Sequence, residues 1–179
     1  AELSTLNALA TTVGQSLDLA EILNSALDKV LELTKSQAGW ISLWDDEREN
    51  LELVVSRGLI GDATHTQEEC IWRCAVCEDV FQAGQARVFQ PSAEHGCQVA
   101  AEIPPDFPAE FPAESPQPPR LSFACVPLES KARVLGVMGL RAVQSEDGIG
   151  LNGEMREMLT AIGRQIGIAI ENARLYEQL

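Results

Sequence analysis

The chain has 179 residues, 13 Lys and Arg against 27 Asp and Glu, a formal net charge of −14 and an isoelectric point near 4.4. This length suits a single domain with a sizeable core. The acidic balance argues against binding to nucleic acid or to an anionic membrane, because both need clustered Lys and Arg.

No secretory or membrane-spanning segment is visible in the sequence. The N-terminus, AELSTLNALATTVG, has no basic stretch before an apolar core, and no uncharged run of about eighteen apolar residues occurs. We therefore expect a cytoplasmic protein without membrane contact. Because the chain lacks an initial Met and ends inside a helical pattern, ENARLYEQL, we expect it to be a piece of a longer protein.

Two helices are predicted at the start of the chain. Residues 1–17 carry apolar side chains spaced four, three and four apart, as in a coiled coil, and are predicted to form an N-terminal signalling or dimerisation helix. Asp18 then has the character of an N-cap, with Glu21 three residues later. The apolar periodicity that follows predicts a core-facing helix to about Thr34.

The middle of the chain alternates strand, helix and loop signals. The segments AGWISLW at 38–44 and NLELVVS at 50–56, joined by DDERE, predict a β-hairpin. EDVFQAGQ predicts a short helix that Gly84 ends, and ARVF predicts a strand. Residues 98–120 contain seven Pro and two FPAE repeats, so we interpret them as an acidic, Pro-rich insertion outside the core.

The last third of the chain predicts a second hairpin and a long helix. LSFACVPL and ARVLGVMGLRAV are expected to be strands joined by the charged turn ESK, and residues 153–179 to be a C-terminal signalling helix. Apolar residues on that helix follow a heptad stripe: Met155, Leu159, Ile162, Ile166, Ala169, Ala173 and Tyr176. Its opposite side also carries apolar residues, so we expect the helix to serve both the sheet and a partner helix in a parallel homodimer.

The order of these elements and the words SFACVPL, VLGVMGL and AIGRQIGIAIENARLYEQL resemble a GAF domain of a bacterial sensor histidine kinase. The resemblance covers nearly the whole of residues 1–179 as one domain. It implies an α+β, GAF/PAS-like fold: an antiparallel sheet of about six strands, with the N- and C-terminal helices packed on one face and a ligand pocket on the other. GAF domains bind varied ligands or none, so the fold does not settle the function.

The cysteines are the most informative residues for function. The segment CIWRCAVC places Cys70, Cys74 and Cys77 close together, and Cys97 follows nineteen residues later. In a straight helix the first three would spread over roughly 10 Å of axis at 1.5 Å per residue, too far for one compact metal centre. We therefore expect an irregular turn at 70–74 and a helix that begins at Cys77, where a thiolate would gain from the helix N-terminus.

Four thiolates suit either a [2Fe–2S] or [4Fe–4S] cluster or structural zinc, and the spacing alone does not separate them. The GAF resemblance favours iron, because a subset of GAF sensor kinases holds an oxygen- or redox-sensitive cluster through cysteines before this short helix and after the next strand. That resemblance implies Cys70, Cys74, Cys77 and Cys97 as ligands. A thiol–disulfide switch and incidental placement are the alternatives, and Cys125 is interpreted as an ordinary core residue.

The two histidines provide fallback ligands. His95 could replace one thiolate in a three-cysteine, one-histidine centre, and either His65 or His95 could bind haem axially, although isolated surface histidines explain both. The sequence has no phosphate loop, HExxH, GxSxG or kinase motif, so we expect no catalytic activity from this chain itself.

The resulting hypothesis is a sensory input domain of a two-component histidine kinase. It would sense oxygen or redox state through the cluster and act on a downstream kinase in the same chain, and thereby indirectly on a response regulator. The alternative is a GAF domain that binds a small organic ligand or haem, with its cysteines bound to zinc or acting as a thiol switch.

Overall fold

The computed structural model describes residues 18–58, 75–89, 120–144 and 151–179. Within these ranges one antiparallel sheet has the strand order β2-β1-β5-β4-β3. Its five strands are β1 (Ala38–Asp45), β2 (Asn50–Arg57), β3 (Arg87–Phe89), β4 (Arg120–Ser130) and β5 (Arg133–Gln144). The helices are α2 (Leu19–Thr34), α4 (Ala75–Ala83), α5 (Arg156–Glu177) and the short 3-10 helix η3 (Gly153–Met155).

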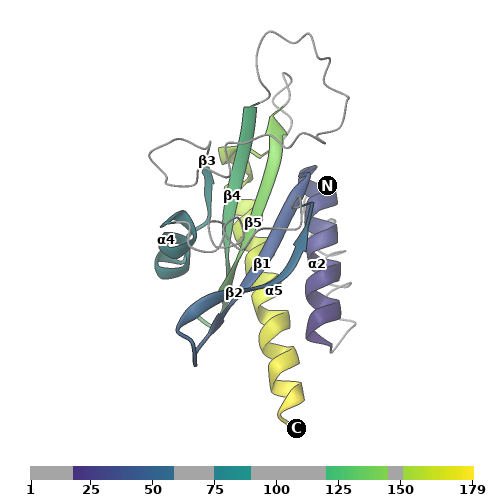
Figure 1. Ribbon diagram of the computed structural model, residues 1–179, viewed down its shortest axis with the longest axis vertical. Helices are drawn as coiled ribbons and strands as arrows, with labels where there is room; N and C mark the ends of the chain where they lie inside the picture. The colour runs from purple at the N-terminus through teal and green to yellow at the C-terminus, as the bar shows by residue number, and fades with distance from the viewer. Residues whose placement is uncertain (1–17, 59–74, 90–119, 145–150) are drawn as a thin grey trace.

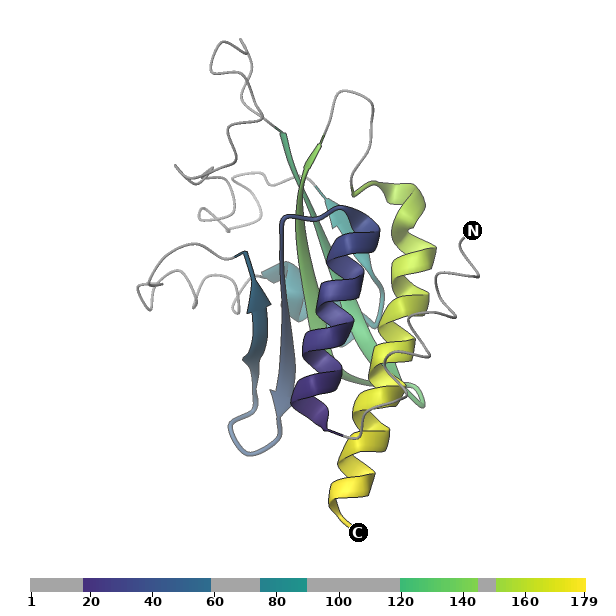
Figure 2. The same cartoon turned by 90° about the vertical axis from the view of Figure 1, so that its right-hand side faces the viewer.

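The helices divide between the two faces of the sheet. α2 and α5 lie side by side against one face, and α4 packs on the other (Figures 1 and 2). The main core lies between the sheet and the α2/α5 pair, and a smaller cluster lies under α4. The predicted α+β fold, with the N- and C-terminal helices on one face of an antiparallel sheet, is confirmed.

Helix α2 begins where the sequence indicates. The carboxylate of Asp18 accepts hydrogen bonds from the backbone N–H groups of Ala20 at 2.9 Å and Glu21 at 3.3 Å, which satisfies two of the donors that a helix start leaves open. Lys35 ends the helix in the left-handed region, at φ 52°. The predicted N-cap and the predicted end at Thr34 are both correct.

Both hairpins form, with turns set by short local contacts. Asp45 Oδ1 accepts from the N–H of Glu47 at 2.8 Å and of Arg48 at 3.2 Å, which holds the β1–β2 turn. Between β4 and β5 the turn is the pair Lys131 and Ala132, with φ of 50° and 63°. The sequence predicted ESK there; instead β4 continues to Ser130, because a two-residue turn of this hand matches the twist of the strands.

The heptad stripe of α5 faces the protein's own core. Leu159, Ile162 and Ile166 are 0% exposed, and Ala173 is 1% exposed, against the sheet and α2. Tyr176, the last member, is 57% exposed. The stripe therefore serves intramolecular packing over most of its length, and it is not available as a dimer seam.

Two glycines let the backbone of α5 approach β4 closely. A Cβ atom on Gly163 would lie 2.8 Å from Val126 Cγ1 and would also overlap the Pro127 carbonyl oxygen. A Cβ atom on Gly167 would lie 2.7 Å from the backbone nitrogen of Glu129. Because these neighbours are backbone or buried, any side chain at either position would push the helix away from the sheet.

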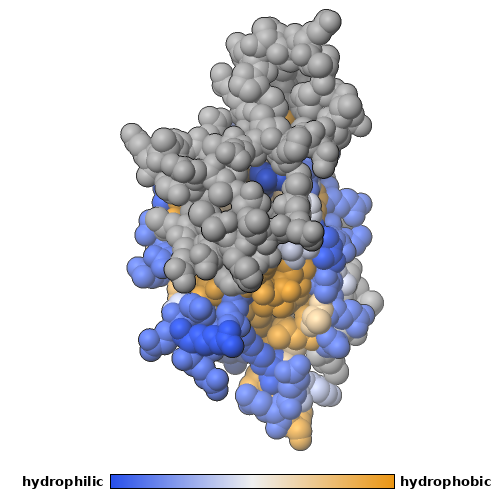
Figure 3. Space-filling view, in the orientation of Figure 1, coloured by the Kyte–Doolittle hydropathy of each residue, from blue (hydrophilic) through white to orange (hydrophobic). Residues whose placement is uncertain are grey.

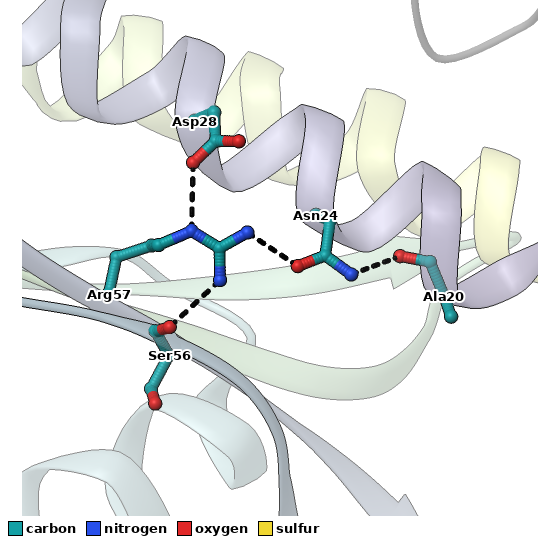
Figure 4. A network of polar contacts seen from close by, with 5 residues as sticks. All are labelled: Ala20, Asn24, Asp28, Ser56 and Arg57. Carbon is teal, nitrogen blue, oxygen red and sulfur yellow. Dashed lines mark hydrogen bonds and ion pairs between the residues drawn. The ribbon is translucent and has the colours of Figure 1, made fainter.

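A polar network ties α2 to the edge strand β2. Arg57 Nε donates to Asp28 Oδ1 at 3.0 Å, and its Nη2 donates to Asn24 Oδ1 at 2.6 Å (Figure 4). Asn24 Nδ2 in turn donates to the carbonyl of Ala20 at 2.8 Å, and Arg57 Nη1 donates to the carbonyl of Ser56 at 3.0 Å. This planar guanidinium fixes the end of β2 against two turns of the helix.

Several sequence predictions lie outside the described residues. These are the N-terminal helix at 1–17, the irregular turn at 70–74 and the Pro-rich insertion at 98–120 except Arg120. In the part of the chain that the structure describes, no helix combines the length and hydropathy needed to cross a bilayer.

The close approach of α5 to β4 generates the first prediction. Gly167→Ala should lower the free energy of unfolding by about 1 to 3 kcal/mol, because its methyl group would meet the backbone of Glu129. Gly153→Ala is the matched control, since a Cβ atom there meets nothing within 4 Å, and it should stay within about 0.5 kcal/mol of the parent chain. Urea unfolding followed by circular dichroism measures both, and equal values would contradict the packing argument.

Candidate functional site

The candidate site is the face of the sheet on which α4 packs. Alternation along the strands sends Ile41, Leu43, Met138 and Leu140 to the α2/α5 side, so the residues between them point to the α4 side. A second hydrophobic cluster lies there, formed by Leu51, Val76, Cys77, Val80, Cys125 and Val137, with Trp44, Phe81 and Phe89 packed against it. This cluster joins the inner side of α4 to the sheet.

Aromatic and charged contacts hold α4 in place. Phe81 of α4 stacks on Trp44 of β1 with ring centroids 4.9 Å apart, and Asp79 pairs with Arg87 of β3 at 3.8 Å. Gly84, at φ +67°, ends the helix, as the sequence predicts. The helix begins at Ala75 rather than at the predicted Cys77, so Cys77 lies within the first turn and its side chain faces the sheet.

Two cysteines meet under α4. The thiol of Cys125 on β4 donates a hydrogen bond to the sulfur of Cys77, with 3.4 Å between the two sulfur atoms. Cys77 is 4% exposed and Cys125 is 3% exposed, and no disulfide joins them. Residues 48 positions apart in the chain thus form a buried pair of thiols between a helix and a central strand.

Of the predicted ligands, the structure places only Cys77. Cys70, Cys74, Cys97, His65 and His95 lie outside the described residues, so their predicted roles stay predictions. Among the described residues no group of three or more His, Cys, Asp and Glu side chains is arranged to hold a metal ion.

Cys125 is a buried core residue, as the sequence predicts, but its contact with Cys77 was not predicted. Within LSFACVPL it resembles any other small apolar residue of a buried strand, and on that basis it was assigned to the core. Strand alternation places it on the face opposite Ala124 and Val126, but the sequence does not say which face meets the cysteine helix. One feature of the sequence could have indicated this contact: Cys125 is an isolated cysteine inside a strand, in a chain whose other cysteines are clustered.

The sulfur separation is compatible with a shared metal. Two thiolates bound to one tetrahedral metal, each about 2.3 Å from it, lie about 3.8 Å apart. The observed 3.4 Å is within a few tenths of an ångström of that value, so small side-chain rotations would admit a metal or a cluster edge. The described pair supplies two thiols of the four that an iron–sulfur cluster needs, and the pair fits that group by chemistry and spacing.

Among the residues that the structure describes, three buried polar atoms on this face have no hydrogen-bond partner. They are Trp40 Nε1, Ser42 Oγ and Arg141 Nε. Trp40 is 7% exposed and Ser42 is 1% exposed. Buried polar groups are normally hydrogen-bonded, so three such atoms on two neighbouring strands need a specific explanation.

The strand register places these three residues in sequence along the β1–β5 ladder, with Trp40 between Ser42 and Arg141. Trp40 lies opposite Gly139, Ser42 opposite Val137, and Arg141 opposite Ala38, so all three fall within a short stretch of the β1–β5 ladder. A Cβ atom on Gly139 would lie 2.6 Å from Trp40 Nε1, so the indole lies directly over that glycine. A β-bulge in the β1–β2 pairing at Ile41/Ser42 adds local distortion next to the unpaired hydroxyl.

Arg141 carries a partly buried charge with little compensation. Its Nη2 donates to the carbonyl of Gly58 at 3.4 Å, and none of the ion pairs among the described residues includes it. Burial lowers the pKa of the Arg141 guanidinium from its ordinary value, because desolvation disfavours the charged form. The partly buried guanidinium therefore carries a desolvation cost, which a nearby hydrogen-bond acceptor would offset.

The surface on this side is apolar where it can be seen. Figure 3 shows hydrophobic side chains gathered near the centre of this face of the sheet, bordered by hydrophilic ones at the edges. Small-molecule sites are lined mainly by apolar side chains with a few polar groups, and the visible side chains at the centre of this face are apolar.

Comparison with known proteins identifies the fold and its relatives. A family model for the GAF domain matches residues 16–171. A search of curated proteins finds no match. Solved structures at low identity do match over most of their length, and they support the fold alone.

Three of these structures show the range of roles that the fold has. The GAF domain of an Acinetobacter phosphoenolpyruvate-protein phosphotransferase has a TM-score of 0.69 and 16% identity, covering 99% of this chain and 98% of that one. A free methionine-R-sulfoxide reductase from Neisseria meningitidis, in complex with its substrate, has a TM-score of 0.68 and 16% sequence identity, and the match covers 98% of this chain and 91% of that one. The GAF domain of a putative sensor histidine kinase from Pseudomonas syringae pv. tomato has a TM-score of 0.60 and 13% sequence identity, and the match covers 99% of this chain and 90% of that one.

The unpartnered hydroxyl of Ser42 leads to a prediction about stability. Ser42→Ala should leave the free energy of unfolding unchanged or raise it by about 1 kcal/mol, because it removes a buried hydroxyl that has no partner. Ser122→Ala is the matched comparison, since that buried hydroxyl donates to the Leu151 carbonyl at 2.7 Å, and its loss should cost about 1 to 3 kcal/mol. Chemical unfolding of both variants tests this; an equal loss at Ser42 would mean that its hydroxyl is satisfied.

Proposed function

The chain belongs to the GAF domain family, and on that premise we propose that it senses oxygen or redox state through a cysteine-ligated iron–sulfur cluster, as the input domain of a two-component histidine kinase. GAF domains are sensory and regulatory, and the GAF domain of a putative sensor histidine kinase is among the solved structures that share this fold. A cytoplasmic location is part of the proposal, because thiols stay reduced there.

The contact between Cys77 and Cys125 is the observation that carries this proposal. Two buried thiols with 3.4 Å between their sulfur atoms lie on the face that α4 covers. Soft thiolates are the ligands that iron–sulfur clusters and zinc prefer. The remaining ligands in this proposal come from Cys70, Cys74 and Cys97, and Cys125 joins the candidates because it already contacts Cys77.

The bound group would supply a redox-active centre whose state depends on oxidants. The protein's own part is to hold Cys77 on the first turn of α4 and Cys125 on β4, so that a change at the sulfur atoms moves helix and strand relative to each other. Metal binding contributes folding energy locally, so a filled and an empty site are two states with different local order.

Strand β4 provides a physical connection from this site to α5. Cys125 faces α4, whereas its neighbour Val126 faces α5 and lies where a Cβ atom on Gly163 would contact it. A displacement of β4 therefore acts on α5 without an intervening mobile side chain. In this proposal α5 passes the change to a kinase domain elsewhere in a longer chain and thus to a response regulator, and this domain has no catalysis of its own.

A dithiol switch is the second candidate, and the same contact favours it. Two thiols and one hydroperoxide would yield one disulfide, one alcohol and one water. In that reaction one sulfur takes the peroxide oxygen as a sulfenic acid, and the second sulfur then displaces water. The sulfur atoms would approach from 3.4 Å to about 2.0 Å, which again would pull α4 toward β4.

A homodimer is also part of the proposal, but on a different surface from the predicted heptad stripe. Because the stripe is buried, the exposed apolar residues of α5 are the candidates: Ile168 at 45% and Leu175 at 51%, with Leu179 at 98%. Ile168 and Leu175 are seven residues apart, with Asn172 between them at spacings of four and three, and Leu179 follows four residues after Leu175, just beyond the end of α5. A second copy of this helix offers the matching row, as a parallel pair requires.

Metal analysis tests the cluster. Protein purified without oxygen should contain about two or four iron atoms per chain with equal acid-labile sulfide and absorb visible light, and Cys77→Ser should lose most of the iron. The matched control is Glu78→Gln, at an exposed residue of the same helix, which should keep the iron.

Other results would separate the alternatives. One zinc ion per chain, without iron, would contradict the iron–sulfur cluster and support a structural metal. The absorption spectrum of haem would also contradict the cluster and would support haem as the bound group. The dithiol switch would be supported if the protein holds no metal and if peroxide treatment lowers its mass by two hydrogens per chain. Cys77→Ser and Cys125→Ser should each abolish that loss of mass.

The outward row of α5 predicts the assembly. Leu175→Glu should raise the dimer dissociation constant by at least about tenfold, because it places a charge in the apolar row of each copy. Gln178→Glu adds the same charge about 80° around the helix from Ile168, at 100° per residue, and should leave dimerisation nearly unchanged. Sedimentation velocity measures both variants, and a parent chain that stays monomeric at high concentration would contradict the dimer.

A further inference from the structure

We propose that Ser130 and Glu171 form a clasp that holds the strained β4–β5 turn onto α5, and that opening this clasp releases the last turns of α5 from the sheet. The clasp is a conformational device of the fold and needs neither a metal nor a thiol. It rests on the proposed function in one respect only, namely that the output of the domain passes through α5.

The side chain of Glu171 contacts two consecutive residues at the end of β4. The hydroxyl of Ser130 donates a hydrogen bond to Glu171 Oε2, and the same oxygen lies 3.9 Å from Lys131 Nζ. Ser130 is 3% exposed, whereas the side chain of Lys131 is 79% exposed. A buried hydroxyl that donates to a carboxylate contributes more than an ion pair in solvent, so Ser130 is the principal partner of Glu171.

The turn that follows Ser130 is strained. Lys131 and Ala132 have φ of 50° and 63°, and neither residue is Gly or Asn. Two-residue turns of this kind favour Asn-Gly or Asp-Gly, because the Cβ atom of any other residue in the left-handed region comes too close to the next carbonyl oxygen. The turn would therefore relax if nothing held it in place.

Glu171 lies where α5 leaves the domain. Gly167, one helical turn earlier, lies directly over the backbone of Glu129, and Ala173 is the last buried residue of the helix. The end of α5 extends beyond the β4–β5 turn (Figures 1 and 2). The clasp is therefore at the boundary between the part of α5 that the sheet holds and the part that projects from it.

The rest of α5 has contacts of its own that do not depend on the clasp. Arg164 Nε lies 3.8 Å from Glu129 Oε2, Gly163 lies over the Pro127 carbonyl, and Ile162 is 0% exposed. Opening of the clasp is therefore a local event that frees α5 from about residue 171 onward and leaves the earlier turns packed. A helix with a held part and a releasable end has two discrete conformations.

Strand β4 joins the clasp to the cysteine pair. Cys125 and Ser130 are five residues apart on this strand. A side-chain hydrogen bond is lost when its atoms move apart by about 1 Å, so a displacement of β4 at Cys125 would open the clasp. This step depends on the proposed function, whereas the clasp itself does not.

Hydrogen exchange of the whole chain, with its thiols kept reduced, measures the opening. Ser130→Ala should raise the exchange rate of the backbone amides at 171–177 at least about tenfold and leave those at 159–166 within about twofold, because only the end of α5 loses a contact. Lys131→Gln should change the rates at 171–177 by less than about threefold, since its ion pair is exposed.

Glu171→Gln provides a second test that does not remove the buried hydroxyl. Its amide oxygen still accepts from Ser130 but carries no charge, so the increase at 171–177 should lie between those of Lys131→Gln and Ser130→Ala. If circular dichroism shows that Ser130→Ala does not fold, this variant decides the proposal, and unchanged rates at 171–177 in it would then count against the clasp.

Ser122→Ala is the matched control. Ser122 is also 3% exposed and also lies on β4, but its hydroxyl donates to the Leu151 carbonyl and not to Glu171. Its loss should destabilise the chain without a selective increase at 171–177. A selective increase there in Ser122→Ala would show that any weakening of β4 frees the helix end, which contradicts a specific clasp.

Ala132→Gly tests the part that turn strain has in the opening. Gly adopts positive φ without strain, so the turn keeps its shape even when the clasp is lost. Combined with Ser130→Ala, it should reduce the increase at 171–177 at least about threefold. An undiminished increase in the double variant would contradict the strained turn as the cause of release.

Three results would overturn the proposal: unchanged rates at 171–177 in a folded Ser130→Ala variant, an increase of equal size along the whole chain, or a difference that disappears on dilution of the protein. The last would assign the protection to a second copy, whereas the clasp lies within one chain. Iron analysis remains independent. Iron without local opening contradicts the clasp alone, and local opening without iron contradicts the cluster alone.

Discussion

The contact between the backbones of α5 and β4 is the constraint on which the rest of this domain depends. Gly163 and Gly167 remove the side chains that would separate helix from strand, so α5 lies directly on the β4 backbone from Pro127 to Glu129. Because the distance between α5 and β4 is short, the side chains of Leu159, Ile162 and Ile166 are fully buried against the sheet and α2. The same short distance makes α5 sensitive to any movement of β4.

The opposite face of the sheet combines features that the packed face lacks. A thiol pair, three unused donors and an aromatic stack that fixes α4 all lie there, whereas the α2/α5 side is an apolar core. The main apolar core and the candidate sites thus lie on opposite faces of the sheet, with the strands in common. Because β4 and β5 contribute residues to both faces, an event on the α4 side has a direct mechanical route to the helices.

Local signals account for the parts of the fold that the sequence predicted well. Asp18 identified the start of α2, and Gly84 identified the end of α4. The alternating patterns identified both hairpins. Each of these features depends on residues within a few positions of one another in the chain. The boundary errors have the same origin. The start of α4 moved from Cys77 to Ala75, and the second turn moved to Lys131 and Ala132, since helix and turn limits depend on packing that local patterns do not contain.

The sequence by itself determined the GAF family, the order of the elements, and the interest of the cysteine segment. Only the tertiary structure decided which residues meet. It turned the heptad stripe of α5 inward, placed Cys125 against Cys77 across 48 residues, and left Trp40, Ser42 and Arg141 with unused donors on one face. The physical reason is that periodicity reveals that a strand or helix has two sides, whereas the assembly of the sheet decides what each side faces.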